Sequence, residues 1–378
     1  MELLRLTGSP FDRGKALGEH FCATLGRVVE KNQRSLALIL ETKGLPPLTD
    51  ARLLAMVRRG LPYAEEYAPD LVEEVAGIAA GAALPFEAVF GFNYFLDLFD
   101  ITYPELTNML MFGCTTLAAT KRATADDGVY LGQNYDLRHL YQDGVVLLQT
   151  EVAPGVEALV FTIAGLVGCA GMNAAGMGIV INNLTPCDSR PGVPYTFILR
   201  RALAQTRLSE ALNTIWAAHR ASGINYMMAD STGEIVSLET TATDGDVLHA
   251  LDEYIGHSNH YVHPRLAAAY SASRPYDGDS YIRWGRVNKL LKQQCGALTV
   301  DRLRDILRDH CGYPHSICRH PVDGLGELRT GNTVASLLMD LRNLTLWAAT
   351  GNPCEHPYEE FRLASATGAG TAGAMTPA

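Results

Sequence analysis

The sequence predicts an α+β fold in which antiparallel sheets and helices are built from separate parts of the chain. Roughly the first hundred residues show the three- and four-residue apolar spacing of helices, whereas the residues after Gly113 change to short β-rich runs broken by glycines. Most of these runs follow one another through tight turns, which favours antiparallel pairing over a parallel sheet with crossover helices.

The helical part begins near Pro10 and continues to about Gly81. Apolar residues recur at helical spacing through three runs, at 13–40, 50–67 and 69–82. We expect a mostly helical N-terminal segment.

The β-rich part opens with a hairpin signal. The runs CTTLAAT (114–120) and VYLGQNYDL (129–137) flank a turn around Asp126, Asp127 and Gly128. Two antiparallel strands are predicted here, with Cys114 at the start of the first.

The remaining chain alternates between groups of strands and groups of helices. Strands are predicted over 145–152, 157–165, 177–184, 225–230, 234–241 and 246–251 and twice within 333–351, and helices over 194–219, 281–294 and 300–310. No period of 20–50 residues recurs, and no linker separates two independent domains. The end of the chain, 363–378, has the low complexity of a disordered tail.

Composition excludes several function classes. The 378 residues carry 31 Lys and Arg against 41 Asp and Glu, a net charge of −10, with no basic run that could follow a phosphate backbone, so we expect no nucleic-acid partner. No apolar run is long enough to span a bilayer and the N-terminus lacks a signal-peptide pattern, so we expect no membrane partner and a cytoplasmic location. The phosphate-loop, dinucleotide, HExxH and GxSxG motifs are missing as well.

Eight cysteines are too few for a disulfide scaffold in a chain of this length, and we expect them to be reduced. The one run suggestive of a metal is HCGYPHSICRH (310–320), where six residues separate Cys311 from Cys318. Zinc sites usually place paired thiols two to four residues apart, and no second pair matches. We therefore interpret the run as a packed helix end and loop, and expect no metal.

Cys114 differs from the other cysteines in its position. It follows Gly113 at the junction of the helical and β-rich parts, so cleavage of the Gly113–Cys114 bond would give a chain that begins with a thiol nucleophile. Its own α-amine, titrating near 7.7–8.0, could then serve as the base. The alternative is a buried structural thiol, which is the commoner role of a cysteine in a β-region.

A series of motifs resembles one enzyme family. The run GCTTLAAT, followed by GQNYD, NAAGMGIVINNL, NYMMAD, HSNHYVHPRL, SICRH and LWAATGNPCE, resembles the acyl-CoA:6-aminopenicillanic acid acyltransferase (isopenicillin N acyltransferase) family of N-terminal nucleophile hydrolases. The resemblance extends from about residue 10 to about residue 360. It implies a four-layer αββα sandwich and self-cleavage before Cys114. The products would be a helical α chain, 1–113, and a β chain whose catalytic core is 114–362.

The resemblance also implies roles for other residues. It points to Asn259 as an oxyanion donor and to Asp136 as an active-site carboxylate that binds the α-ammonium. Further candidates for support of the site are Asn134, Thr116, Arg283, Ser280 and His260. For the arginine, Arg274 and Arg286 are alternatives in neighbouring register.

We therefore predict a self-cleaving cysteine amidohydrolase or N-acyltransferase that acts on a small N-acyl amide or acyl thioester through a Cys114 thioester, without a cofactor. An acyl-CoA-dependent N-acyltransferase of secondary metabolism is the nearest alternative. Three others remain: a papain-type pair of Cys114 with His257 or His260, an unprocessed binding protein, and a zinc hydrolase built on 310–320. After cleavage the two chains should stay associated, and the sequence leaves open the acyl group, the amine and whether the protein forms a homo-oligomer.

Overall fold

The computed structural model describes residues 1–42, 44–46, 49–102, 113–270, 278–322, 324 and 331–364. The tail expected over 363–378 falls outside the described residues from position 365 onward, as does Arg274.

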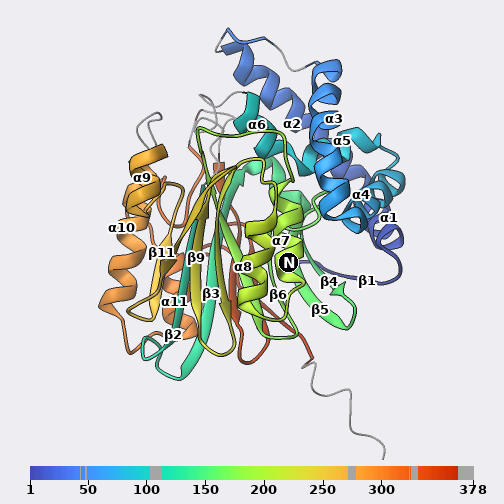
Figure 1. Ribbon diagram of the computed structural model, residues 1–378. Helices are drawn as coiled ribbons and strands as arrows, with labels where there is room; N and C mark the ends of the chain where they lie inside the picture. Colours follow the sequence, from blue (N-terminus) through green and yellow to red (C-terminus); the bar gives the residue numbers. More distant parts are fainter. Residues whose placement is uncertain are drawn as a thin grey trace, which may run out of the picture.

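The N-terminal segment is helical, as predicted, except for one short strand at its start. Its elements are β1 (Leu3–Leu6), α1 (Pro10–His20), α2 (Cys22–Thr42), α3 (Asp50–Tyr67), α4 (Pro69–Ala82), α5 (Phe86–Asn93) and α6 (Phe95–Thr102). These helices, blue to teal in Figure 1, lie at the top and along one side of the molecule in that view.

Two sheets make up most of the remaining chain. The first contains β1, β4 (Val145–Ala153), β5 (Val156–Ile163), β6 (Ala170–Asn173), β7 (Met177–Leu184), β8 (Gly223–Asp230), β9 (Ile235–Thr240) and β10 (Gly245–His249), in that spatial order. The second has the order β11 (Tyr254–His257), β2 (Gly113–Lys121), β3 (Asp127–Arg138), β12 (Gly331–Asp340), β13 (Thr345–Thr350) and β14 (Glu359–Arg362).

The two sheets face one another, and helices cover their outer faces. Strands β2 and β3 pack against β7 and β8, so the inner faces of both sheets share one apolar core. Helices α7 (Tyr195–Leu203) and α8 (Leu208–Ala217) cover the first sheet, and α10 (Gly278–Gln293) and α11 (Val300–Leu307) cover the second (Figure 1). The four-layer αββα sandwich is therefore confirmed; α9 (Pro264–Tyr270) lies beside it.

The predicted strands are present, but the sequence analysis also missed β6, β11 and β14, and not every ladder is antiparallel. Strand β1, which the sequence analysis missed, pairs in parallel with β4, whereas the other ladders are antiparallel. The runs predicted as single helices at 13–40 and 194–219 are each broken in two, the first at Phe21 and the second between α7 and α8. Apolar periodicity continues across both breaks, because the two helices of each pair bury their apolar sides in the same core.

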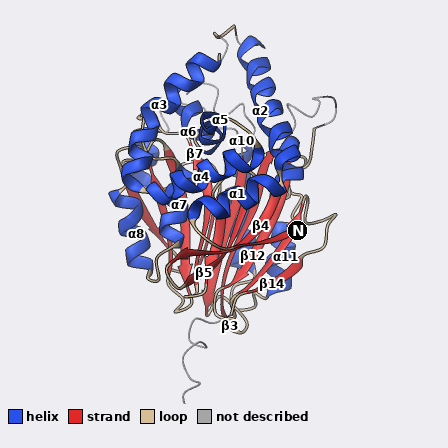
Figure 2. Ribbon diagram, turned by 90° about the vertical axis from the view of Figure 1, so that its right-hand side faces the viewer, coloured by secondary structure: helices blue, strands red, loops and turns tan. Residues whose placement is uncertain are grey.

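Close backbone packing fixes helices α1 and α4 of the N-terminal segment against each other. Figure 2 shows α1 and α4 side by side. A Cβ at Gly14 would lie 1.9 Å from the carbonyl oxygen of Glu74, and one at Gly77 would lie 2.1 Å from that of Phe11. Only glycine permits this approach, and the helices therefore meet backbone to backbone.

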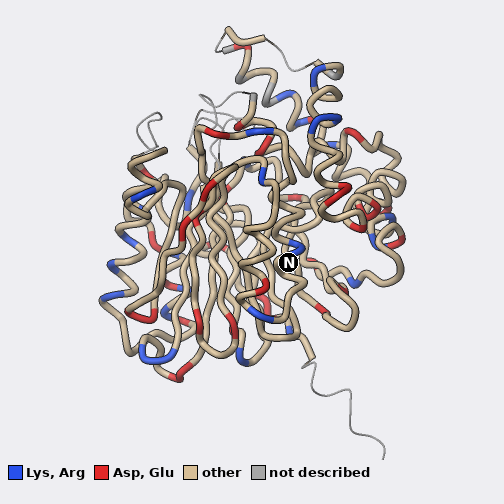
Figure 3. The backbone as a smooth tube through the Cα atoms, viewed as in Figure 1, with Lys and Arg blue, Asp and Glu red and all other residues tan. Residues whose placement is uncertain are grey.

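Buried polar contacts join the helical segment to the sandwich. Arg200 of α7 binds both carboxylate oxygens of Glu74 of α4, at 3.1 and 3.2 Å, with both side chains 2% exposed. Asn93 donates to the carbonyl of Gly165 and accepts from the amide of Val167. Charged residues of both signs are interspersed along the rest of the described chain (Figure 3).

Candidate active site

The hairpin of β2 and β3 has different surroundings on the two faces of its sheet, and Cys114 lies at the start of β2. Side chains alternate along a strand. Thr116 reaches Asn182 of the opposite sheet, which places Cys114, two residues earlier, on the inner face as well. Thr115 is reached by Arg283 of α10, so the outer face of the hairpin lies under the helix layer.

Three side chains hold the main chain of Cys114. The backbone nitrogen of Cys114 donates to Oδ1 of Asn259 at 2.8 Å. Its carbonyl oxygen accepts from Nδ2 of Asn182 at 3.0 Å and from a guanidinium nitrogen of Arg283 at 2.7 Å. A second nitrogen of Arg283 donates to Asn259 Oδ1 at 2.9 Å, which closes the arrangement. The backbone of the candidate nucleophile is therefore fixed on both sides of its Cα atom.

The thiol itself is buried and protonated. Cys114 is 6% exposed, and burial together with the negative charge of Asp136 raises the pKa of the thiol to about 12. Hydrogen bonds from the Asp136 backbone and the Gln133 side chain oppose this shift without reversing it. An uncharged thiol needs a base at the moment it attacks.

Asp136 lies on the outer face, opposite Gly113 in the β2–β3 ladder. It is fully buried; Oδ1 accepts from the hydroxyl of Thr333 at 2.7 Å, and Oδ2 lies 3.6 Å from Nε of Arg319 without a hydrogen-bond partner. Burial raises the pKa of Asp136 to about 6, although Arg319 and Arg283 both lower it. Its charge is therefore sensitive to pH close to neutrality.

Gly113 is surrounded by these charged groups. A Cβ built on Gly113 would lie 3.3 Å from Asp136 Oδ2 and 3.4 to 3.5 Å from the guanidinium nitrogens of Arg319 and Arg283. A Cβ at this position would be slightly tight against the carboxylate and in ordinary contact with both cations. A larger side chain would have to displace these charged groups.

A buried carboxylate orders the loop that carries Asn259. Glu239 of β9 is fully buried, and its oxygens contact His257 Nε2 at 2.7 Å and accept from the amides of Val262 and His263 at 2.6 and 3.0 Å. Within the loop, the backbone N–H of Asn259 donates to the hydroxyl of Ser280. Ser280 is therefore a positioning residue for Asn259.

The orientation of the Asn259 amide follows from its neighbours. Cys114 N and Arg283 can only donate, so the group that faces them is the oxygen. The nitrogen then points to the carbonyl of Asn183, at 3.1 Å. In this arrangement Asn259 contacts the backbone of Cys114 through its acceptor oxygen, and the oxyanion role that the resemblance implies for its donor stays a prediction.

The two histidines have other partners. The ring nitrogens of His257 are hydrogen-bonded to Glu239 and to the carbonyl of Ser258. His260 Nδ1 lies 2.8 Å from Ser280 Oγ, its ring stacks on Tyr281, and burial lowers its pKa to about 3. These contacts favour structural roles for both rings over a papain-type base.

The two remaining candidates lie on different faces. Thr116 is buried and donates to Oδ1 of Asn182, so it orients one of the side chains that hold Cys114. Asn134 instead fastens two loop carbonyls, those of Leu307 and Ile317, and accepts from Ser336. Asn134 shares the outer face with Asp136, as expected, but its polar contacts serve the fold.

Sequence reasoning missed Asn182 and Arg319. Asn182 stands in the run MGIVINNL, where alternation alone predicts a strand, and its role depends on a neighbouring sheet. Arg319 stands in the 310–320 run. Its guanidinium reaches Asp136, Asp279 of α10 and Nδ1 of His315. Only the tertiary fold brings these segments to Gly113.

A small apolar cavity of about 30 Å³ adjoins the site through Tyr135, the residue opposite Cys114 in the ladder. Its lining comes from the helical segment and from both sheets: Phe92, Phe95, Leu96, Tyr135, Leu137, Tyr141, Ile163, Leu166 and Tyr195. Two of the aromatic residues that precede Gly113 thus line a cavity, whereas Tyr94 and Phe99 are buried in the core.

Two expectations on metals and membranes can be compared with the structure. Cys318 lies close to His310, His320 and Cys354, whereas Cys311 is exposed and lies outside this group. The spacing between Cys311 and Cys318 therefore considered the wrong pair of thiols. Within the described ranges, no helix combines the length and apolar character needed to cross a bilayer.

Comparison with known proteins relates the chain to acyl-transferring enzymes. Residues 123–355 match the family model described as acyl-coenzyme A:6-aminopenicillanic acid acyl-transferase. The 40 kDa form of acyl-coenzyme A:6-aminopenicillanic-acid-acyltransferase from Emericella nidulans is 26% identical over 365 residues, which cover 94% of this chain and 93% of the relative.

Two solved structures show more distant likeness. A mutant of the conjugated bile acid hydrolase from Clostridium perfringens is 12% identical, with a TM-score of 0.45 over 67% of this chain and 97% of that one. Penicillin V acylase from Agrobacterium tumefaciens is also 12% identical, with a TM-score of 0.44 over 63% of this chain and 83% of that one.

Proposed function

The chain belongs to the acyl-coenzyme A:6-aminopenicillanic acid acyl-transferase family, and we propose that Cys114 becomes its N-terminal nucleophile by self-cleavage after Gly113. The observation that carries this proposal is the fixation of the Cys114 backbone by Asn259, Asn182 and Arg283. A structural thiol in a core needs no such set of buried polar partners, since a plain ladder would hold its backbone.

Self-cleavage would proceed by an N-to-S acyl shift. The Cys114 thiol attacks the carbonyl carbon of Gly113, the peptide C–N bond breaks, and the thiol proton goes to the departing nitrogen. Water then hydrolyses the thioester, which leaves a carboxylate on Gly113 and a free amine on Cys114. The cationic Arg283 and Arg319 beside Gly113 support this step, because they can stabilise negative charge on the reacting carbonyl.

In the catalytic cycle the free amine would replace the missing base. It takes the thiol proton as the sulfur attacks the substrate acyl carbon, and passes it to the leaving group. Asn259 Oδ1, now 2.8 Å from this nitrogen, would orient the amine, and Asp136 would balance the neighbouring charges. The Asn259 amide nitrogen carries two hydrogens, of which Asn183 takes one, so the other could serve the substrate oxyanion.

We propose that the substrate is a small N-acyl amide or acyl thioester with an apolar acyl group. The apolar lining beside Tyr135 supports this choice by its composition: two phenylalanines and aliphatic side chains, with the hydroxyls of Tyr135 and Tyr195 3.4 Å apart. At about 30 Å³ the cavity holds little more than a water molecule, so an acyl group would enter it only when these side chains move apart. Water would complete hydrolysis of the acyl-enzyme, and an amine would complete acyl transfer. The relative from Emericella nidulans, an acyltransferase by name, is the reason to test both acceptors.

Mass spectrometry of the denatured protein tests self-cleavage. We expect two chains of about 12 and about 29 kDa, the 41.0 kDa chain divided after residue 113, and a single chain from Cys114→Ala. Cys169→Ala is the matched control, because Cys169 is equally buried but should leave cleavage unchanged. A purified wild-type protein that remains one chain, or a cleaved Cys114→Ala variant, would contradict the proposal and favour a binding protein.

A screen of N-acyl amides and acyl thioesters of increasing chain length tests the substrate. We expect the mass of the acyl group to be added to the β chain at Cys114, and added hydroxylamine or a primary amine to remove it. Acylation that is equal for charged and apolar acyl groups would contradict the assignment of the cavity.

A further inference from the structure

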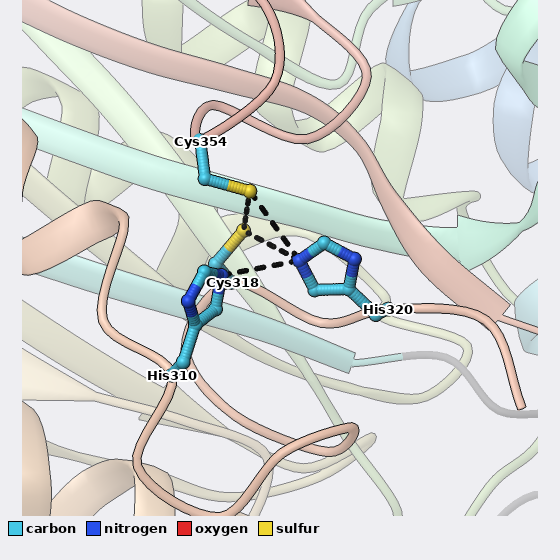
Figure 4. Close-up of side chains that lie close together, drawn as sticks. All are labelled: His310, Cys318, His320 and Cys354. Carbon is cyan, nitrogen blue, oxygen red and sulfur yellow. Dashed lines mark hydrogen bonds between the residues drawn. The ribbon is translucent and has the colours of Figure 1, made fainter.

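Four side chains that the proposed reaction does not use converge on one point in the structure. They are His310, Cys318, His320 and Cys354, and one ligand atom from each lies within 4.8 Å of all the others. Figure 4 shows the two sulfur atoms and the imidazole nitrogens directed toward a common centre. Three come from the segment between α11 and β12, and Cys354 comes from the loop between β13 and β14.

We propose that these four residues form a structural zinc site. Zinc bound at about 2.3 Å to sulfur and about 2.0–2.1 Å to nitrogen in a tetrahedron requires about 3.8 Å between two sulfurs, about 3.6 Å between sulfur and nitrogen, and about 3.3 Å between two nitrogens. The two sulfurs are 3.5 Å apart, His320 Nε2 lies 3.6 and 3.4 Å from them, and the two histidine nitrogens are 3.1 Å apart.

The chemistry of the donors selects zinc over harder cations. Two thiolates and two imidazoles in tetrahedral spacing suit Zn²⁺, whereas Mg²⁺ and Ca²⁺ take oxygen ligands. Two thiolates also neutralise the charge of the ion, so the centre can lie partly buried without a net charge. With four protein ligands the site has no open position, which makes it structural and argues against the zinc hydrolase considered from the sequence.

Neighbouring groups support the ligands as they do in known zinc sites. Nδ1 of His320 lies 3.6 Å from a carboxylate oxygen of Glu355, the arrangement by which a carboxylate orients a metal-bound imidazole. Asn352 donates to the sulfur of Cys318 at 3.4 Å and to the carbonyl of Arg319 at 2.6 Å. A hydrogen bond to sulfur stabilises the thiolate that zinc requires.

The site would have a consequence for Gly113, because Arg319 stands between two of its ligands. The backbone of Arg319 is held by Thr333 and Asn352, and its side chain reaches Asp136 and Asp279. An ion bound to Cys318 and His320 would fix both neighbours of Arg319. Arg319 is then a positioning residue whose placement depends on the metal.

Elemental analysis of the full-length protein, purified without chelator after growth with added zinc, tests the site. We expect about one zinc per chain, and at least a tenfold loss of bound zinc in a Cys318→Ser/Cys354→Ser double variant. Cys311→Ser is the matched control: Cys311 lies in the same segment but outside the group, so this variant should retain zinc. Cys114→Ala should retain it too, which keeps the test independent of the proposed reaction.

A second measurement does not depend on the folding of variants. Wild-type protein stripped by chelator and titrated with Co²⁺ alone should develop the visible bands of tetrahedral cobalt and a thiolate-to-cobalt charge-transfer band, and Zn²⁺ should abolish both. Stripping should also slow cleavage after Gly113 in unprocessed protein, and zinc should restore it. The proposal is overturned if neither metal binds, if Cys311→Ser removes it, or if native protein contains a Cys318–Cys354 disulfide.

Discussion

Two cysteine sites in this protein use their polar neighbours in opposite ways. At Cys114 the strongest polar contacts of the buried side chains are to the backbone nitrogen and carbonyl, and the sulfur is buried near the Asp136 backbone and the Gln133 side chain. At Cys318 and Cys354 the sulfurs themselves are the meeting point, with two imidazoles and an asparagine amide around them. The first arrangement suits a thiol that acts as a nucleophile, and the second suits thiols that bind a metal ion.

The comparison also separates two ways of preparing a thiol. Burial raises the pKa of Cys114, so this thiol attacks only as its proton is taken, by the departing peptide nitrogen in self-cleavage and by the free α-amine afterwards. The second pair needs no base, since a bound ion displaces the thiol protons directly. Substitutions at each site, compared with one another, test this distinction.

The largest expected effect is at Cys114. Replacing Cys114 by Ala should abolish both self-cleavage and acyl-enzyme formation and leave the zinc content unchanged. The Cys318→Ser/Cys354→Ser variant should show the converse pattern: zinc is lost, while self-cleavage slows only about tenfold because the loss acts through Arg319. Intact-mass time courses and elemental analysis on the same samples would measure both. Equal losses from both variants would show that the sites are one cooperative unit.

The next effect is at the guanidinium that clamps Cys114. Arg283→Gln removes charge-assisted hydrogen bonds to Cys114 and Asn259, and we expect self-cleavage to slow by about 10²-fold, or roughly 3 kcal/mol. Arg286→Gln on the same helix is the control. It loses a part-exposed ion pair with Asp309 worth about 0–1 kcal/mol, so cleavage should hardly change. If Arg286→Gln slowed cleavage more than Arg283→Gln, the arginine that supports cleavage would be Arg286.

Asp136 gives a smaller, pH-dependent effect. Because burial raises its pKa in the folded protein to about 6, above the ordinary carboxyl value near 3.9, protonation favours the folded state. Its contribution to the free energy of unfolding should therefore rise as the pH falls from about 6 to about 4. Over the same window the cleavage rate should rise, because protonation of Asp136 removes the negative charge that raises the pKa of Cys114 and offsets Arg283 and Arg319. Asp279 stays ionised, since its pKa is lowered.

The difference between wild type and Asp136→Asn isolates this group from other carboxyls. Denaturant unfolding and cleavage rates at a series of pH values would measure it. If Asp136→Asn shows the same pH dependence of stability and cleavage as the wild type between pH 6 and 4, the titration of Asp136 does not contribute to either.

The positions of most strands and of the candidate nucleophile were accessible from the sequence, because both depend on local patterns. Alternation and turn residues identify the hairpin of β2 and β3, and the Gly113–Cys114 pair stands at its start. Strand β1 was missed since four residues carry too little periodicity, and its parallel pairing with β4 joins positions more than 140 residues apart.

The surroundings of the two cysteine sites were less accessible. The resemblance supplied Asn259, Asp136 and Arg283, and the structure brings all three to Gly113 and Cys114. Asn182 and Cys354 could not be found, because each meets its partners only when two sheets or two distant loops pack together. For the metal site, local spacing pointed to Cys311, whereas the cysteine that completes the group lies 36 residues beyond Cys318.

The smallest effect concerns a relay behind the Cys114 clamp. Ser237 donates to Asn225 at 2.7 Å, Asn225 donates to Asn182 at 2.9 Å, and Asn182 donates to the carbonyl of Cys114. All three side chains are fully buried. Ser237→Ala should lower the free energy of unfolding by about 1–2 kcal/mol and slow cleavage only a few-fold, because Asn182 keeps its other donor, Thr116.

Ser336→Ala is the matched control for the relay. Ser336 is equally buried, donates to Asn134 at 2.6 Å and lies 2.6 Å from the hydroxyl of Tyr358, but Asn134 contacts the carbonyls of Leu307 and Ile317 and not Cys114. Ser336→Ala should therefore lose at least as much stability as Ser237→Ala in denaturant unfolding, while only Ser237→Ala slows cleavage at equal folded fraction. If Ser336→Ala slows cleavage as much, the outer face of β3 is coupled to the nucleophile through Asn134, and the contrast between the two cysteine sites is weaker than their geometry indicates.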